Sequence, residues 1–230
     1  MKYTHLFFDL DHTLWDFERN SAESLAELYE NHKLKSLGIN DLSDFQSKFS
    51  EINQFHWNLL DKNLITHDEL RRRRFADTLN ALGVEADEDF GLKLNEDFLK
   101  LLPHKPHLIE GAIEILDYLA PKYELHIISN GWLDIQFNKM NSSKITHYFG
   151  EVITNERANA RKPDPKIFEY AVGLTNASLS NSLMIGDNYE ADILGAKSAG
   201  MDSVYFNPET FEATDANYTI NHLLKLKNIL

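Results

Sequence analysis

The chain has 230 residues, and its 36 Asp and Glu side chains outnumber its 23 Lys and Arg side chains, so the net charge is −13. This acidity excludes nucleic acid and an anionic membrane surface as main partners, because both repel a negative protein. The absence of cysteine excludes disulfides and thiol catalysis. No apolar run is long enough to span a bilayer, and Asp9 and Asp11 come too early for a signal peptide. We therefore expect a cytoplasmic protein.

The first predicted element is a short buried strand at residues 4–8, and two aspartates, Asp9 and Asp11, follow it directly. Ligands of open α/β sheets bind beyond the carboxyl ends of the strands. Unpaired carboxylates at such a place are costly unless they bind a cation or take part in catalysis. Ordinary turn or helix-cap aspartates are the alternative interpretation.

Residues 18–102 show only helical periodicity, and we predict that they form an inserted all-α cap domain, residues 16–107. Thr66 and Glu69 have the spacing of a capping box, and Gly83 can end the helix that they begin. The four predicted helices cover about 21–34, 43–60, 66–82 and 87–102.

Four consecutive arginines, residues 71–74, belong to the third of these helices. Helical spacing places Arg73 opposite the apolar face of the helix and Arg71 and Arg72 beside that face. We therefore expect a solvated surface here, and contact of one arginine with a bound phosphate is the alternative.

Strands alternate with helices from residue 108 onward, which predicts a parallel sheet wrapped by helices, an α/β fold of the Rossmann-like type. The sheet is split in the sequence, because its first strand precedes the helical block. The core domain would therefore comprise residues 1–15 and 108–230. The predicted strands are 125–128, 151–153, 183–185 and 203–206, and the predicted helices are 112–119, 133–140, one that opens at Pro165, 190–199 and one near His222.

Polar residues follow the second strand and precede a later helix. Ser129, Asn130 and Gly131 offer a hydroxyl, an amide and accessible backbone N–H groups, which can bind phosphate oxygens, although the same tripeptide also forms ordinary turns. Lys162 stands just before a helix entrance that an N-cap aspartate and Pro165 define. A solvated lysine is the alternative interpretation.

A second pair of aspartates follows the strand at 183–185. Asp187 ends that strand, and Asp192 lies five residues further on, in the first turn of a predicted helix. An acidic residue in a first helical turn also complements the helix dipole, which is the structural alternative for Asp192. No such alternative applies to Asp187.

In their order and spacing, these four stretches resemble the four motifs of the haloacid dehalogenase superfamily of phosphotransferases. The resemblance covers essentially the whole chain, and the helical block resembles the cap that this superfamily inserts after its first strand. The segment 157–160 has fewer glycines than is usual for the family. A closer resemblance, to the pyrimidine 5′-nucleotidase branch, is carried by Trp57, residues 64–66, Arg74, Phe75, residues 127–131 and Gln136.

The resemblance implies Mg²⁺-dependent hydrolysis of a phosphate monoester through an aspartyl-phosphate. Asp9, the backbone carbonyl of Asp11, and Asp187 would bind Mg²⁺, and Asp192 would orient these ligands. Asp9 would attack phosphorus, while Asp11 would protonate the leaving alkoxide and then deprotonate the hydrolytic water. The phosphate oxygens would be bound by Thr13, Ser129, Asn130, Gly131 and Lys162.

The implied substrate is a small phosphate ester, with pyrimidine nucleoside or deoxynucleoside monophosphates as the first choice. Trp15 and Trp132 are expected near the mouth of the site, where a ring could stack on a nucleobase, and Phe17 is a reserve candidate. Packing of the cap against the core is the alternative role for the two tryptophans.

Other functions remain open at this stage. A sugar-phosphate phosphatase or a phosphomutase would use the same motifs, whereas a 2-haloacid dehalogenase would have no need of Asp11. A phosphoryl-accepting signalling protein would need only about half this length and no cap.

Overall fold

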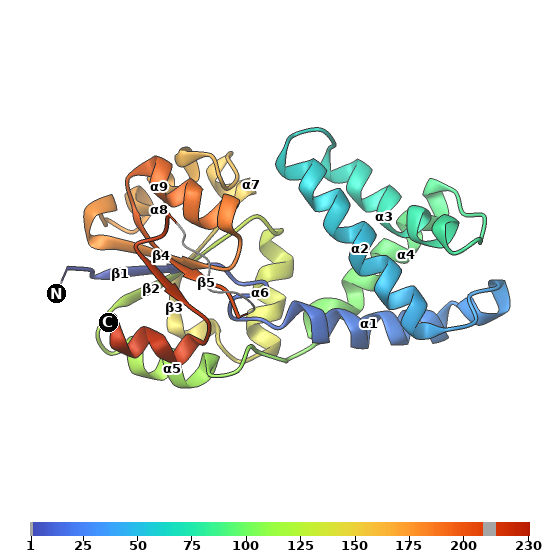
Figure 1. Ribbon diagram of the computed structural model, residues 1–230, viewed down its shortest axis with the longest axis horizontal. Coiled ribbons are helices and arrows are strands. Elements are labelled where there is room, and N and C mark those ends of the chain that lie inside the picture. The colour runs from blue at the N-terminus through green and yellow to red at the C-terminus, as the bar shows by residue number, and fades with distance from the viewer. Residues whose placement is uncertain (1, 209–214) are drawn as a thin grey trace. The chain divides into compact units, whose positions relative to one another are not determined.

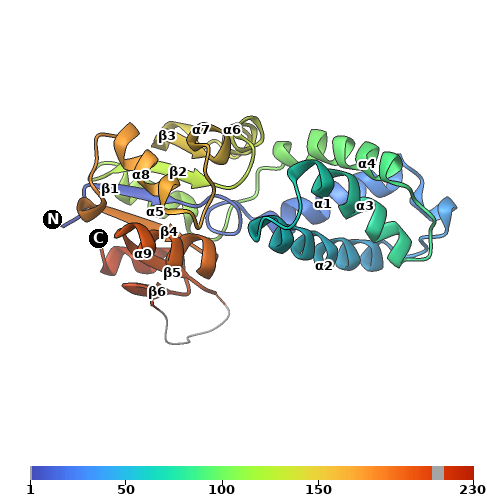
Figure 2. The same cartoon turned by 90° about the horizontal axis from the view of Figure 1, so that it is seen from above.

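The computed structural model describes residues 2–208 and 215–230, and within these residues it contains a six-stranded parallel sheet (Figures 1 and 2). The strand order is β3-β2-β1-β4-β5-β6. The chain therefore adds β2 and β3 on one side of β1 and then β4, β5 and β6 on the other side. This arrangement confirms the predicted α/β fold and puts a topological switch point between β1 and β4. The strands are β1 (His5–Phe8), β2 (Glu124–Ser129), β3 (Phe149–Thr154), β4 (Ser182–Gly186), β5 (Asp202–Phe206) and β6 (Tyr218–Ile220).

The helices of the core lie on both faces of this sheet. Figure 1 shows α8 (Pro165–Leu174) and α9 (Gly195–Ala199) above it and α5 (Ala112–Leu119) below it. Strand β1 is buried at all four positions, as expected for a central strand with helices on either side. Two further helices, α6 (Leu133–Ser142) and α7 (Asn155–Ala158), follow β2 and β3, and a 3₁₀ helix (Leu223–Asn228) lies near the C-terminus.

Two parts of the core differ from the sequence-based prediction. The strand at residues 203–206 is not the last one, because β6 pairs with it; β6 has only three residues, too few for a periodic pattern. The helix predicted at 190–199 begins instead as a π-helical turn, Tyr189–Leu194, and only its second half is α-helical. Such wide turns occur frequently at functional sites.

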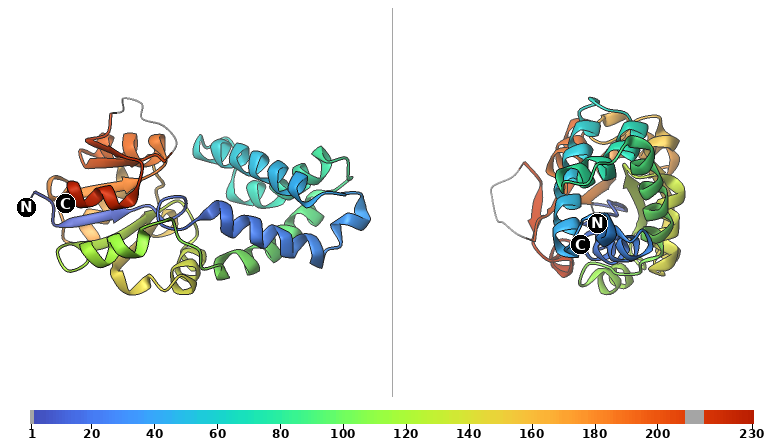
Figure 3. Two further views of the ribbon diagram at one scale, coloured as in Figure 1. Left: turned by 60° about the horizontal axis from the view of Figure 1, so that its bottom comes forward. Right: turned by 90° about the vertical axis from the view of Figure 1, so that its right-hand side faces the viewer.

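The chain separates into two compact units, Met1–Phe17 with Pro106–Leu230, and Glu18–Lys105. In the second unit α3 packs against both α2 and α4 (Figure 3). Thr66 and Glu69 form the predicted capping box at the start of α3. None of the helices in the described part of the chain is both long and apolar enough to cross a membrane. The long helices outside the core are α1 (Phe17–Asn31), α2 (Leu42–Asp61), α3 (His67–Ala81) and α4 (Glu88–Leu101).

The expectation of a solvated arginine run is wrong for Arg74. Its side chain is 2% exposed, and its guanidinium donates to Asn95 Oδ1 at 2.8 Å and to Asn53 Oδ1 at 3.0 Å. Burial lowers the pKa of Arg74 to about 9. The long aliphatic stem of arginine allows a charged residue to occupy a core position, which the binary pattern of the helix does not indicate.

Close packing between α3 and α4 depends on Gly91. A Cβ at this position would meet the carbonyl oxygen of Arg72 at 2.3 Å and Ala76 Cβ at 2.9 Å. Gly91→Ala should therefore destabilise the protein by about 1–3 kcal/mol through overpacking, although better helix propensity offsets about 1 kcal/mol of this. Urea unfolding measures the difference.

The matched control is Gly173→Ala in α8, where a Cβ would meet nothing within 4 Å. This substitution should raise the free energy of unfolding by about 0.4–1 kcal/mol. Equal stabilities of the two variants would contradict the close approach of α3 and α4.

Candidate active site

The predicted motif residues converge at the carboxyl ends of β1, β2 and β4. Asp9 follows β1, Ser129 ends β2, and Asp187 follows β4. The Asp9 N–H donates to the carbonyl oxygen of Ile185 at 2.9 Å, which ties the end of β1 to β4. These residues are far apart in sequence and become neighbours because the ends of parallel strands meet at one edge of the sheet.

Lys162 lies buried at the centre of this site. Its Nζ donates to Asp9 Oδ1 at 2.6 Å, to Asp192 Oδ1 at 2.6 Å and to the carbonyl oxygen of Ile128 at 2.9 Å. Burial lowers the pKa of the ammonium, but the two carboxylates outweigh this effect, so the pKa is raised above its usual value. The interpretation of Lys162 as a solvated lysine is therefore wrong.

Three carboxylates surround this lysine. One oxygen each of Asp9, Asp187 and Asp192 lies within 4.8 Å of the others, an all-oxygen set of the kind that Mg²⁺ prefers. The Thr13 hydroxyl donates to Asp187 Oδ1 at 2.8 Å, and the Asn188 N–H donates to Asp192 Oδ2 at 3.0 Å. The predicted contact of the Thr13 hydroxyl with phosphate is thus replaced here by a bond that orients Asp187.

Additional positive charge would stabilise the cluster of three carboxylates. Burial raises the pKa of Asp9 to about 7, despite the opposing effect of Lys162, and burial together with Asp9 raises the pKa of Asp187 to about 6. A divalent cation would relieve this repulsion. Gly186 allows the close packing, because a Cβ there would meet the Asp192 carboxylate at 2.2 Å.

Ser129 keeps its hydroxyl hydrogen available for a ligand. Its Oγ accepts from the Gly131 N–H at 3.1 Å and from Gln136 Nε2 at 2.6 Å, so its own O–H can donate to a phosphate oxygen. The Asn130 side chain is used differently from the prediction, because its amide bonds to the backbone N–H and carbonyl of Lys162, both at 2.9 Å. Asn130 thereby holds the lysine segment against the end of β2.

Asp11 is held by two residues of α6. Lys139 Nζ lies 2.7 Å from Asp11 Oδ1 and 2.8 Å from Asp11 Oδ2, and Gln136 Nε2 donates to Asp11 Oδ2 at 3.0 Å. Burial raises the pKa of Asp11, but Lys139 and Gln136 outweigh it, so the pKa is lowered. Lys139 was not predicted from the sequence, where its only signal is its position about one turn after Gln136 on the same helix.

The aromatic residues expected at the mouth of the site are less accessible than predicted. Trp15 is fully buried, and Lys139 Nζ lies 4.7 Å above its ring. This burial contradicts stacking of Trp15 on a base. Phe17 is half-buried against the His12 ring at 4.9 Å, and Trp132, 9% exposed, is the N-cap residue of α6.

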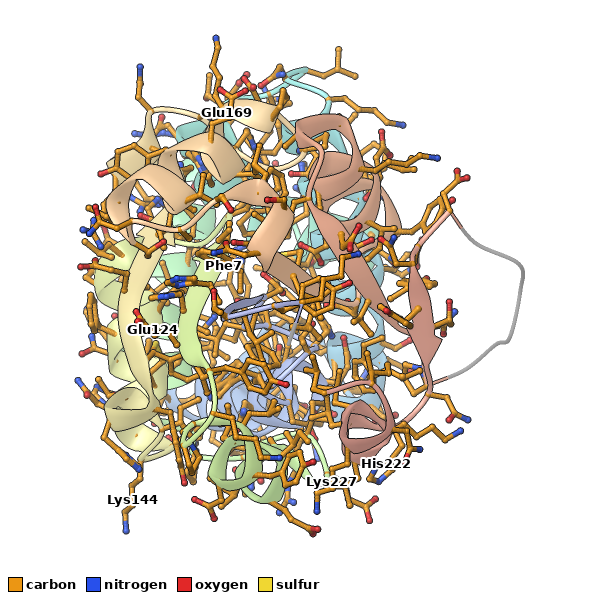
Figure 4. All side chains as sticks on the ribbon, turned by 90° about the vertical axis from the view of Figure 1, so that its left-hand side faces the viewer. Phe7, Glu124, Lys144, Glu169, His222 and Lys227 are labelled. Carbon is orange, nitrogen blue, oxygen red and sulfur yellow. The ribbon has the colours of Figure 1, made fainter. Side chains whose placement is uncertain are left out.

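A second cluster, His5, Glu124 and His126, lies at the opposite, amino end of the strands; Figure 4 labels Glu124 there. His5 Nδ1 and His126 Nε2 are 3.3 Å apart, the ring centroids are 5.6 Å apart, and the rings are inclined by only 17°. The two nitrogens therefore lie on the line between the ring centres, as in an N–H···N hydrogen bond. The Glu151 N–H donates to His126 Nδ1 at 3.3 Å, which places the proton on Nε2. This cluster is a hydrogen-bonded histidine pair.

The fold and the site define an α/β protein with an acidic, lysine-bridged centre at the switch point of its sheet. A family model described as haloacid dehalogenase-like hydrolase matches residues 6–206. The chain belongs to this hydrolase family, which confirms the resemblance inferred from the four motifs.

Three similar proteins cover nearly the whole chain. The pyrimidine 5′-nucleotidase PynA of Streptococcus pneumoniae is 33% identical over 215 residues, which are 92% of this chain and 87% of PynA. The pyrimidine 5′-nucleotidase YjjG of Escherichia coli is 29% identical over 234 residues, covering 100% of this chain and 99% of YjjG. The solved structure of the HAD-hydrolase YfnB from Bacillus subtilis, bound to magnesium, has a TM-score of 0.90 and 29% identity, and the match covers 100% of this chain and 99% of that one.

The raised carboxylate pKa values predict how pH and metal affect stability. A pKa that is higher in the folded than in the unfolded chain means that folding takes up protons, so this contribution to stability falls as pH rises from about 4 through about 6 for Asp187. In chelator, the free energy of unfolding of Asp187→Asn should therefore equal that of the wild type near pH 4. At pH 8 it should exceed the wild-type value by about 1–3 kcal/mol. Urea titrations at the two pH values measure this difference.

Excess Mg²⁺ at pH 8 should reverse the order, because an ion held by the carboxylate cluster would stabilise the folded wild type and the variant would lack one carboxylate of that cluster. Asp134→Asn, the same change at an exposed position, serves as the control. A wild type that remains as stable as Asp187→Asn in chelator at pH 8 would contradict the raised pKa.

Proposed function

We propose that this protein hydrolyses small phosphate monoesters with the help of Mg²⁺ and through an aspartyl-phosphate. The observation that carries the proposal is the contact of one buried ammonium, that of Lys162, with Asp9 and Asp192 beside a third carboxylate, Asp187. A phosphate dianion can approach these carboxylates only when positive charge offsets theirs. Asp9, Asp187 and the backbone carbonyl of Asp11 would hold Mg²⁺, which would supply that charge and polarise the phosphate.

The residues of the chain then divide the reaction into two displacements. Asp9 attacks phosphorus, and the ester oxygen leaves with a proton from Asp11. Water, deprotonated by Asp11, then attacks the aspartyl-phosphate and regenerates Asp9. Lys162 offsets the charge of the Asp9 carboxylate, and the Ser129 hydroxyl would donate to a nonbridging oxygen. The Gly131 backbone N–H, predicted to bind phosphate, instead donates to Ser129 Oγ and so orients that hydroxyl.

For the substrate, we propose pyrimidine nucleoside 5′-monophosphates, with the deoxyuridylate and thymidylate types first. The support comes from two relatives named pyrimidine 5′-nucleotidases, which match 92% and 100% of this chain. It also comes from Gln136, singled out by the resemblance, whose amide connects Ser129 to Asp11. Nucleotides of this kind occur in the cytoplasm, where we expect the protein to act.

Asp9→Asn should abolish turnover, because an amide is a poor nucleophile for phosphorus, while the volume of the side chain and therefore the fold are kept. Phosphate release from a nucleoside monophosphate, measured with freshly prepared protein before deamidation can restore aspartate, tests this expectation. Asp134→Asn is the control and should retain full activity. Steady-state hydrolysis by Asp9→Asn at the wild-type rate would refute the assignment of the nucleophile.

The substrate proposal predicts a clear order in a phosphate-release screen. With Mg²⁺, kcat/KM should be highest for pyrimidine nucleoside 5′-monophosphates, lower for purine nucleotides and sugar phosphates, and activity should vanish in chelator. A preference for sugar phosphates would instead identify a sugar-phosphate phosphatase. Halide release from a 2-haloacid in chelator would refute phosphatase chemistry itself.

A further inference from the structure

Two side chains of α6 hold the carboxylate of Asp11. Lys139 contacts both carboxylate oxygens, at 2.7 and 2.8 Å, and Gln136 donates to Oδ2 at 3.0 Å. The second N–H of the same Gln136 amide is used on Ser129 Oγ at 2.6 Å. Gln136 thus sets the distance between a phosphate-binding hydroxyl and the proposed acid–base group.

Lys139 is itself held in one place. Only 5% of its side chain is exposed, and its Nζ lies 4.7 Å above the Trp15 ring. Trp15 belongs to the same turn as Asp11, since its carbonyl accepts from the His12 N–H at 2.9 Å and its N–H donates to the Leu10 carbonyl at 2.8 Å. The ammonium therefore sits between the Asp11 carboxylate and a ring that is rigidly attached to the Asp11 backbone.

Stability alone does not account for this arrangement. Desolvating an ammonium and a carboxylate costs about as much as their attraction returns, and an apolar residue of similar volume is often as stable or more so. Proton transfer, in contrast, needs a heavy-atom distance of about 2.6–3.2 Å, and a misplacement of about 1 Å can slow a reaction about 100-fold. A fixed Asp11 serves catalysis more than folding.

We propose that Lys139, together with Gln136, is the positioning residue for Asp11 in the second displacement of the reaction. This inference rests on the proposed function. In that step a water O–H proton passes to the Asp11 carboxylate while the water oxygen bonds to phosphorus and the bond between phosphorus and the Asp9 oxygen breaks.

The test separates the two displacements with p-nitrophenyl phosphate and excess enzyme in the presence of Mg²⁺. Release of p-nitrophenolate reports the first displacement, which needs no proton donor for so good a leaving group, and release of inorganic phosphate reports the second. In Lys139→Met the first rate should stay within about twofold of the wild type, and the second should fall about 10- to 100-fold. Lys139→Arg, which keeps the positive charge, should retain most of the wild-type rate of phosphate release.

A double-mutant cycle shows whether Lys139 acts through Asp11. In the Asp11→Asn background, Lys139→Met should change phosphate release by no more than about twofold, because the group that it positions is already gone. Lys122→Met, which removes an ammonium lying 3.2 Å above the Tyr118 ring, is the matched control and should leave both rates unchanged.

Four results would overturn the inference. Equal losses in the two displacements would show that Lys139 supports the site as a whole. Full additivity with Asp11→Asn would show that Lys139 acts independently of Asp11. A wild type that releases no phosphate from any ester would refute the proposed function, and this inference with it. Normal activity of the wild type, together with unchanged rates in Lys139→Met, would refute this inference alone.

Discussion

The structure of the site depends on one interaction, the contact of the buried Lys162 ammonium with Asp9 and Asp192, each at 2.6 Å. A buried charge is tolerated only when it is paired and hydrogen-bonded, so this contact fixes three separate segments relative to one another. These segments are the end of β1, the residues before α8 and the π-helical turn after β4. The wide turn at Tyr189–Leu194 brings Asp192 back toward the strand end, where Gly186 leaves space for its carboxylate.

Charge balance explains why such a site is suited to phosphate only with a cation present. Lys162 offsets one of the three clustered carboxylates, and burial raises the pKa values of Asp9 and Asp187. The whole chain carries −13, so no long-range field attracts an anion. Capture of a phosphate ester must therefore come from groups within the site, which is the situation in which an oxygen-liganded divalent ion is most effective.

The two aspartates of the first motif have separate lysine partners. Asp9 is paired with Lys162 from the segment before α8, whereas Asp11 is paired with Lys139 from α6. The pairing gives the two carboxylates different electrostatic environments, because burial raises the pKa of Asp9 while Lys139 lowers that of Asp11. Two neighbouring carboxylates thus acquire different affinities for a proton through their surroundings.

The sequence by itself determined the parallel sheet and the set of residues at its edge. Apolar strands that end in Asp9, Ser129 and Asp187 suffice for this, because the carboxyl ends of parallel strands meet whatever the details of packing. The tertiary structure alone decided the partners of these residues. Lys139 reaches Asp11 across 128 positions of sequence, and Arg74 enters the core of its unit among amide groups. A charged residue in a helix is expected at the surface, and only long-range packing determines which one is paired inside instead.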